Sequence, residues 1–384
     1  MNTRLLRVIA VISLIVLTIP FAIGAAPEKE RKIIIFKPGV TDSARSAIVR
    51  AHGGDKLQEL SLINGQSITL PVGKAAALAA EPEVLRVEED YYIKAAGKPA
   101  KTVSQPPQSL PWGIDRIDAE KAWTSYTGEP VRVAVVDTGI DTTHPDLLPN
   151  LKGGVSCVSY TTAYKDDNGH GTHVAGIIGA VDNTIGVVGV GPRIDLYAVK
   201  VLDRKGSGYI SDIIKGLEWC VSNQIQVINM SLGSPYYSQA LGDAVKRVNA
   251  AGIVQVAAAG NSSNAVNYPA AYDEVIAVGA TDSMNSLAYF SCYGPQVDLV
   301  APGVSIYSTY KGMAYTTLSG TSMAAPHVTG AAALLIDSGK ATTPSTVQSV
   351  LEAAATDLGQ PGKDIYFGSG LVNVYNAVYL NGQL

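Results

Sequence analysis

The 384-residue sequence predicts an α/β protein built on a doubly wound parallel sheet with helices on both faces, preceded by a small α+β domain. From about residue 112 onward, continuous apolar runs alternate with helical segments, as strands buried on both faces do. Before residue 95 the elements are shorter and follow an order typical of a ferredoxin-like sandwich. A content of 47% hydrophobic and 16% charged residues, with 38 glycines, indicates a globular chain with many tight loops.

The first 26 residues have the three-part pattern of a secretory signal peptide. Arg4 and Arg7 supply a basic start, residues 8–19 are apolar, and Gly24, Ala25 and Ala26 offer small side chains for cleavage. The apolar run is shorter than the roughly 20 residues that span a membrane. We therefore expect secretion to the extracellular space, removal of residues 1–26, and no membrane attachment afterwards.

Residues 27–96 are expected to form the small domain. Its pattern predicts strands at residues 32–36, 57–62, 67–70 and 84–89, and helices at residues 43–51 and 73–80. The order βαββαβ is that of a ferredoxin-like fold. Residues 97–107 have little to bury and contain Pro99, Pro106 and Pro107, which is typical of a linker or an N-terminal extension.

Residues 108–384 carry the longer alternation of strands and helices. Strands are predicted at residues 131–136, 195–201, 225–230, 252–258, 275–278 and 297–300, and helices at residues 170–179, 211–222, 239–251 and 322–336. In such sheets the functional site lies outside the carboxyl ends of the strands. Asp137, Ser231 and Asn261 come after predicted strands and are therefore candidates.

Four side chains offer catalytic chemistry, and three of them also have a structural interpretation. Ser322 begins an alanine-rich helix, where free N–H groups favour an oxyanion, but it also fits a simple N-cap. Asp137 follows a buried strand and could cap its own loop. His170 opens a helix, where a neutral imidazole can accept a proton. Asn261 could donate to an oxyanion, although Gly-Asn pairs are also common in turns.

Other functions are disfavoured by composition and spacing. A formal charge of −4 offers no basic surface for nucleic acid. His170 and His173 could share a zinc ion, but no third ligand lies nearby, so we expect His173, His144 and His327 to be structural. The glycines at 186–191 follow a helix instead of a strand, which argues against a phosphate loop. The sequence allows at most one disulfide and does not identify its members among Cys157, Cys220 and Cys292.

Five segments together resemble the motifs of the subtilisin-like serine proteases, the subtilases. The likeness extends from about residue 108 to the C-terminus, and residues 27–96 resemble the propeptide of that family. The segments are residues 136–140 (VDTGI), 170–176 (HGTHVAG), 229–233 (NMSLG), 259–261 (AGN) and 320–324 (GTSMA).

The resemblance implies a serine endopeptidase that works through an acyl-enzyme. Ser322 would be the nucleophile, His170 the general base and then acid, and Asp137 the group that orients the imidazole. Asn261 and the backbone N–H of Ser322 would form the oxyanion hole. Two rivals are weaker. A catalytically dead binding protein would lack a triad member, and an esterase elbow would have glycine where Ala324 stands.

In this family a peptide substrate binds as an added strand between two backbone segments. Small residues in the first pocket imply broad, apolar-leaning specificity for protein and peptide substrates. The residues that match the substrate-binding segments and this pocket are Ser231, Leu232, Gly233, Gly206, Ser207, Gly208, Ala258, Ala259, Gly260 and Ala270.

The resemblance also implies a structural calcium site. One carboxylate, two amide oxygens and three backbone carbonyls suit a hard cation such as Ca²⁺. The matching side chains are Gln108, Asp146 and Asn183, and the matching carbonyls are those of Val181, Ile185 and Val187.

The family's propeptide inhibits its own enzyme until it is cut off. We expect self-cleavage between Ala96 and Gly97, because Ile93 and Ala96 would place an apolar and a small side chain in the cleft. The simplest members of the family begin their mature chain at the position of Pro106-Pro107. A peptide bond that is followed by proline is a poor substrate, so this chain departs from the family pattern there. The expected product is a monomeric mature enzyme, with the propeptide as its inhibitor.

Overall fold

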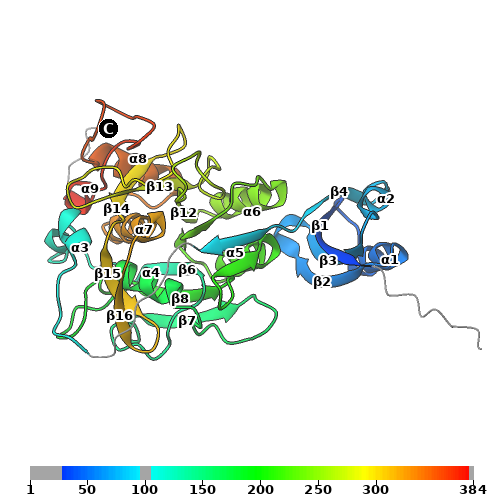
Figure 1. Ribbon diagram of the computed structural model, residues 1–384, viewed down its shortest axis with the longest axis horizontal. Helices are drawn as coiled ribbons and strands as arrows, with labels where there is room; N and C mark the ends of the chain where they lie inside the picture. The colour runs from blue at the N-terminus through cyan, green and yellow to red at the C-terminus, as the bar shows by residue number, and fades with distance from the viewer. Residues whose placement is uncertain (1–27, 96–104, 380–384) are drawn as a thin grey trace, which may run out of the picture.

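The computed structural model describes residues 28–95 and 105–379, which form a large α/β domain and a smaller domain beside it (Figure 1). The predicted signal peptide and the predicted cut between Ala96 and Gly97 lie outside these residues. None of the helices within the described ranges is long and apolar enough to cross a membrane.

The described part of the large domain contains a seven-stranded sheet of the predicted class. Its strands run in the order β14-β13-β12-β10-β6-β8-β7, and each neighbouring pair is parallel. Because β6 lies centrally beside β10, the carboxyl ends of these two strands meet at one edge. The strands are β6 (Arg132–Asp137), β7 (Leu151–Ser156), β8 (Asp195–Lys200), β10 (Val227–Met230), β12 (Val254–Ala258), β13 (Ile276–Thr281) and β14 (Leu299–Pro302).

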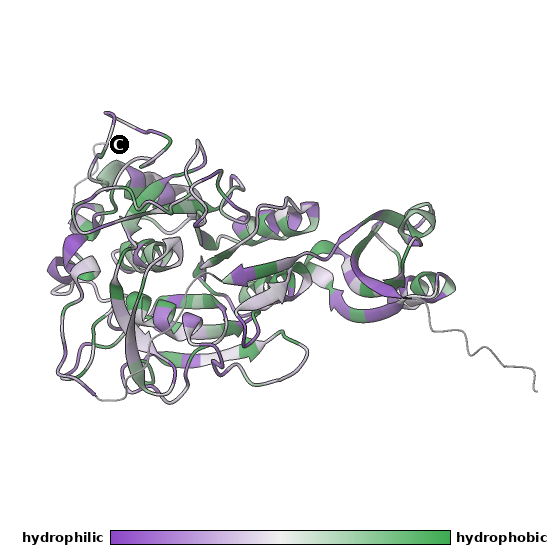
Figure 2. Cartoon of the chain, viewed as in Figure 1, coloured by the Kyte–Doolittle hydropathy of each residue, from purple (hydrophilic) through white to green (hydrophobic). Residues whose placement is uncertain are grey.

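Helices cover both faces of this sheet, as the continuous apolar strands predicted. Alternate residues of β6 point to opposite sides: Val133 and Val135 pack with helices α4 and α7, whereas Ala134 and Val136 pack with α5 and α6. Figure 2 shows the hydrophobic strands between these helices. The helices are α4 (His170–Gly179), α5 (Ile210–Ser222), α6 (Gln239–Ala250) and α7 (Thr321–Asp337).

Several peripheral elements were not predicted from the sequence. They include the edge strand β7 and a hairpin whose two strands pair antiparallel. The hairpin strands are β15 (Ile306–Tyr310) and β16 (Ala314–Leu318), and the helices are α3 (Trp112–Arg116), η2 (Glu120–Ala122), α8 (Pro344–Ala354) and α9 (Val374–Tyr379).

The small domain has the predicted βαββαβ order and an antiparallel sheet with strand order β2-β3-β1-β4. Ile34 and Phe36 face its own two helices, while Ile33 and Ile35 face the core shared with α5 and α6. Its elements are β1 (Lys29–Phe36), α1 (Asp42–Ala51), β2 (Asp55–Leu60), η1 (Ser61–Ile63), β3 (Gly65–Pro71), α2 (Ala75–Ala79) and β4 (Val84–Glu89).

One strand extends from the small domain into the large one (Figure 1). Strand β5 (Tyr92–Ala95) pairs antiparallel with both β9 (Ser207–Tyr209) and β11 (Leu232–Gly233). These three strands form a separate sheet in the order β11-β5-β9. The small domain therefore continues directly into an extended segment held between two backbone segments of the large domain.

Candidate active site

Asp137 and His170 meet at the carboxyl edge of the large sheet. Asp137 is the last residue of β6, and His170 is the first residue of α4. The His170 Nδ1 atom lies 2.8 Å from Asp137 Oδ1 and 2.9 Å from Oδ2, and the carboxylate is fully buried. A carboxylate at this nitrogen holds the proton on Nδ1 and makes Nε2 the basic atom. The pair can therefore act as an oriented general base.

Ser322 lies in the first turn of α7 and is bonded to the loop that follows β10. Its hydroxyl donates to the Ser231 carbonyl at 3.2 Å, and Ser231 Oγ donates to the Ser322 carbonyl at 2.8 Å. Since β10 neighbours β6, these reciprocal bonds bring the start of α7 to the sheet edge that carries Asp137. Free N–H groups at a helix start favour negative charge there.

Asn261 is fixed beside Ser322 by a residue that sequence reasoning missed. The Asn261 Oδ1 atom accepts from the backbone N–H of Thr321 at 2.8 Å and from its hydroxyl at 3.0 Å. Because the oxygen is occupied, the amide NH₂ is the end left to donate elsewhere. The only sequence signal for this contact was a hydroxyl residue directly before Ser322.

The segments predicted to bind substrate flank an extended strand of the same chain. The backbone N–H of Ala95 donates to the Gly206 carbonyl at 2.6 Å, and Leu232 faces Ala95 on the other side. Ile93 is 1% exposed and packs into the core that includes Leu232. The two flanking strands thus provide main-chain bonds on both edges of an extended peptide.

The predicted first pocket is brought together only in part. Ala259 and Ala270 are buried in the same core, but the side chain of Ala258 packs into the core on the opposite face. Gly260 has a φ of +116°, and a Cβ there would come within 2.9 Å of Cys292 Sγ. Glycine is therefore required at position 260, where a side chain would crowd the turn that carries the Asn261 amide.

The three side chains predicted to bind calcium form one connected cluster. Asn183 Nδ2 donates to Asp146 Oδ1 at 2.8 Å, and Gln108 Oε1 accepts from the Asn183 backbone N–H at 2.6 Å. The Ser109 N–H donates to the Gly186 carbonyl, which ties the segment around Gln108 to the loop 181–187. The structure therefore brings the three predicted side chains together, with Asn183 Nδ2 facing Asp146 and Asn183 Oδ1 accepting from the Ile185 N–H at 2.7 Å.

The charge of Asp146 favours a cation in this cluster. Its side chain is fully buried and accepts from neutral groups, the Val187 N–H at 3.0 Å and the Tyr315 hydroxyl at 2.9 Å. No ion pair found in residues 28–95 or 105–379 involves it. A buried carboxylate is costly without a compensating charge. The described residues contain no group of three His, Cys, Asp or Glu side chains suited to a metal. The donors that Asp146, Asn183 and Gln108 can offer are oxygens, which suit a hard, oxygen-preferring cation.

His173 and His327 occupy structural positions, as predicted from the sequence. His173 Nε2 lies 3.1 Å from the Ile306 carbonyl, and burial lowers its pKa to about 3. His327 Nδ1 lies 2.8 Å from the Met323 carbonyl, and burial lowers its pKa to about 4. Neither group is suited to proton transfer near neutral pH. Cys157, Cys220 and Cys292 are free cysteines in this structure.

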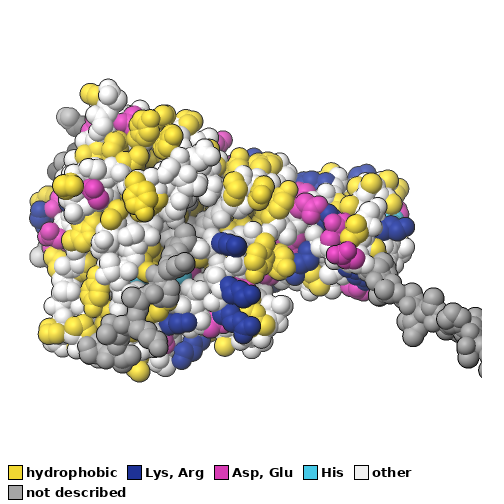
Figure 3. Space-filling view, in the orientation of Figure 1, with side chains coloured by type: hydrophobic (Ala, Val, Ile, Leu, Met, Phe, Trp, Pro, Cys, Tyr) yellow, Lys and Arg dark blue, Asp and Glu magenta, His cyan; other side chains and the backbone are white. Residues whose placement is uncertain are grey.

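Charged side chains of both signs gather where the two domains meet (Figure 3). Asp90 accepts from the Ser211 N–H at 2.9 Å in the first turn of α5 and from Arg31 Nε at 2.9 Å. Glu88 accepts from the Ala240 N–H at 3.1 Å in the first turn of α6. Two carboxylates of the small domain thus cap two helices of the large one, where the helix dipole favours negative charge.

Comparison with known proteins finds one family and many relatives. Residues 128–370 match the model of the subtilase family. The chain is 44% identical over 366 residues to subtilisin amylosacchariticus of Bacillus subtilis subsp. amylosacchariticus, covering 93% of this chain and 92% of the relative. It is 50% identical over 273 residues to subtilisin DY of Bacillus licheniformis, covering 70% and 98%. It is 42% identical over 373 residues to a thermostable alkaline protease of Halalkalibacterium halodurans, covering 96% and 97%.

Proposed function

This chain belongs to the subtilase family and is a serine endopeptidase, and we propose that it is a secreted enzyme that cuts proteins with Asp137, His170 and Ser322 as its triad. The observation that carries the residue assignment is the bond of His170 Nδ1 to buried Asp137, with Ser322 bonded to the loop that follows the neighbouring strand β10. The order Asp, His, Ser along the chain is the one known for subtilisin.

In the proposed reaction, His170 Nε2 takes the Ser322 proton as Oγ attacks the peptide carbonyl. The resulting oxyanion accepts from the Ser322 N–H and the Asn261 amide, which Thr321 holds by its oxygen. His170 then gives the proton to the leaving amine, and a water molecule repeats the sequence on the acyl-enzyme. Asp137 stabilises the imidazolium that forms at each step.

Substrates would bind as a strand between β9 and β11. The bonding of β5 to both supports this, because the same backbone groups are available to any extended peptide. Hydrogen bonds to the main chain do not select particular side chains of the substrate. The small residues Ala259, Gly260 and Ala270 leave room for apolar substrate side chains. We therefore infer broad specificity with an apolar preference.

The small domain would act as a propeptide and inhibitor. Strand β5 fills the cleft, and Ile93 is buried there. Cleavage between Ala96 and Gly97 would follow, because that bond comes directly after the strand. Residues 1–26 would direct secretion, and the mature enzyme would be a monomer.

One calcium ion would stabilise the loop at residues 181–187. Gln108, Asp146 and Asn183 would hold it with carbonyls of that loop. Its contribution would be structural, since it balances the buried Asp146 charge and ties the segment near residue 108 to the large domain.

Replacement of the nucleophile tests the proposal. Ser322→Ala should abolish casein hydrolysis and leave the secreted chain uncut, whereas the wild type should be labelled at Ser322 by a sulfonyl fluoride. In subtilisin itself, loss of the nucleophile costs about 10⁶ in kcat. Cleavage of casein by a purified Ser322→Ala protein would refute the assignment.

A further inference from the structure

A second buried carboxylate lies beside Asp137 and His170 and has no part in the chemistry above. Asp166 is 3% exposed, and the groups around it donate to it. Backbone N–H groups can only donate, so these bonds favour the ionised carboxylate and oppose the rise in the pKa of Asp166 that burial causes. Its oxygens accept from Thr138 Oγ1 at 2.9 Å, Asn168 N at 2.9 Å, Gly169 N at 2.8 Å, Thr172 N at 3.0 Å and Thr172 Oγ1 at 2.6 Å.

Asp166 helps to cap the helix that begins with His170. The N-cap residue, Gly169, has no side chain with which to satisfy the first N–H groups of α4. Side chains from elsewhere replace it: Asn168 Oδ1 accepts from His170 N at 3.1 Å, Thr138 Oγ1 from Gly171 N at 2.9 Å, and Asp166 Oδ2 from Thr172 N at 3.0 Å. The position of His170 therefore depends on these three acceptors.

Thr138 connects this cap to the catalytic carboxylate. Its backbone N–H donates to Asp137 Oδ1 at 2.7 Å, while its hydroxyl donates to Asp166 and accepts from the Gly171 N–H. One residue thus touches the end of β6 and the first turn of α4. A shift of Thr138 would change the distance between Asp137 and His170.

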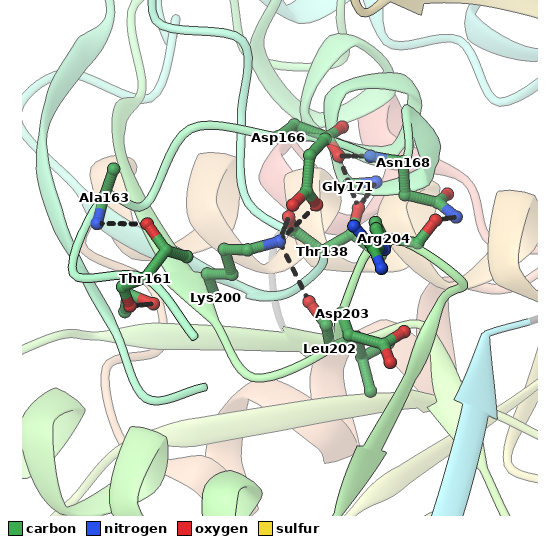
Figure 4. Close-up of polar contacts among 12 residues, drawn as sticks. Thr138, Thr161, Ala163, Asp166, Asn168, Gly171, Lys200, Leu202, Asp203 and Arg204 are labelled. Atoms are coloured by element: carbon green, nitrogen blue, oxygen red, sulfur yellow. Dashed lines mark hydrogen bonds and ion pairs between the residues drawn. The ribbon is translucent and has the colours of Figure 1, made fainter. Parts of the chain in front are cut away.

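Lys200 braces Thr138 from the neighbouring strand β8. Its side chain is fully buried, and its Nζ donates to the carbonyls of Thr138 at 2.7 Å and Leu202 at 3.0 Å and to Asp167 Oδ1 at 2.7 Å. Figure 4 shows Lys200 reaching toward Thr138 and Leu202, with Asp166 close by. The ammonium uses one proton for each partner, and its charge is paired with the partly exposed carboxylate of Asp167.

We propose that Asp166 and Thr138, braced by Lys200, are positioning residues that hold Asp137 and His170 at bonding distance. The proposal rests on the triad assigned above. Groups that orient a catalytic residue typically contribute about 10- to 100-fold when they are removed. We expect this loss in kcat and not in KM, because Asp166, Thr138 and Lys200 lie outside the pairing of β5 with β9 and β11, where the substrate would bind.

The sharpest test compares Thr138→Val with Thr138→Ser in the full chain. Valine keeps the shape and removes the hydroxyl, whereas serine keeps the hydroxyl. We expect valine to lower kcat on a peptide anilide by about 10- to 100-fold with KM within twofold, and to slow sulfonyl fluoride labelling of Ser322 equally. Serine should restore both rates to within about threefold of the wild type.

A matched control separates positioning from stability. Thr143 Oγ1 donates to Asp141 at 2.7 Å, outside this group of residues, so Thr143→Val should lower the melting temperature without changing kcat. The proposal is overturned if Thr138→Val melts earlier but keeps kcat within twofold, or if serine is as slow as valine.

A second variant decides the matter if Thr138→Val does not fold. Asp166→Asn keeps the size of the side chain and removes the acceptor charge, and it should show the same fall in kcat at unchanged KM. Normal kcat in Asp166→Asn would overturn the proposal. An unlabelled Ser322 in the wild-type protein would instead refute the proposed function, so the two failures are distinguishable.

Discussion

The two domains bury their sheets in different ways. The large sheet has a core on each face, and both are made mainly from helices of its own domain. The small sheet has one core of its own, and its other face packs with α5 and α6. Its own core consists of Ile34, Phe36, Val49, Ile68, Leu70, Leu78 and Val84. A domain of this size is marginal when half of its sheet depends on a partner.

The junction between the two domains combines this apolar packing with charged side chains. Asp90 and Glu88 cap helices of the large domain, and Arg31 pairs with Asp90. Bonds of this kind give orientation and specificity at modest net affinity. We therefore expect the large domain to be stable on its own, whereas the small domain depends on its contact with the large one.

The largest expected effect is loss of folding in the isolated small domain. Residues 28–95 expressed alone would expose Ile33, Ile35 and Leu60, each worth about 1.5–3 kcal/mol when buried. That sum is comparable to the stability of a small domain. Circular dichroism should show little cooperative structure until the large domain carrying Ser322→Ala is added. Cooperative unfolding of residues 28–95 alone would remove the contrast drawn above.

Removal of the proposed calcium ion should affect the large domain. Chelation, or Asp146→Asn, should lower its stability by up to about 4 kcal/mol, as expected for a ligand present at 1,000 times its Kd. Calorimetry of the mature enzyme measures this loss, and kcat at low temperature should be unchanged. The exposed Asp273→Asn is the matched control, and an equal loss there would argue against a site at Asp146.

Loss of one helix cap should weaken the junction more modestly. Asp90→Ala leaves the Ser211 N–H and Arg31 without their acceptor, which should cost about 1–3 kcal/mol, or 5- to 150-fold in affinity. Inhibition of the mature enzyme by the separately added small domain measures the change. Glu81→Ala, whose carboxylate lies by His52 within the small domain, should leave the affinity unchanged.

The last prediction concerns the pH dependence of the same affinity. Burial raises the pKa of Asp212 to about 7, with Arg31 opposing and nearby Asp90 reinforcing the shift. We expect separation of the domains to expose this carboxyl and return its pKa toward 3.8, so association takes up a proton between about pH 4 and 7. Affinity should therefore fall by at most tenfold per pH unit as pH rises through that window.

Asp212→Asn provides the control for that dependence. The amide cannot titrate, so the affinity of this variant should be nearly independent of pH between 4 and 7. A slope that persists in Asp212→Asn would assign the proton uptake to another group at the junction.

The main elements of both domains could be predicted because each carries its own periodic signal. The helix at residues 170–179 was predicted with the bounds that the structure shows. Strand β7 escaped prediction because Gly153 and Gly154 interrupt its apolar pattern at the sheet edge. Strands β9 and β11 are short and gain their pairing from β5, more than 100 residues earlier, so no local pattern reveals them.

The family, the fold class and the candidate triad could be predicted from residue patterns, because motif residues and apolar periodicity are local properties of the chain. The folded structure was needed to show that Asp166 and Lys200 contact Thr138 beside Asp137, and that Thr321 holds Asn261. These contacts join segments that are distant in sequence, and they exist only once the parallel sheet aligns its strand ends. Burial then makes each of them matter, because a polar group removed from water must find its partner inside the protein.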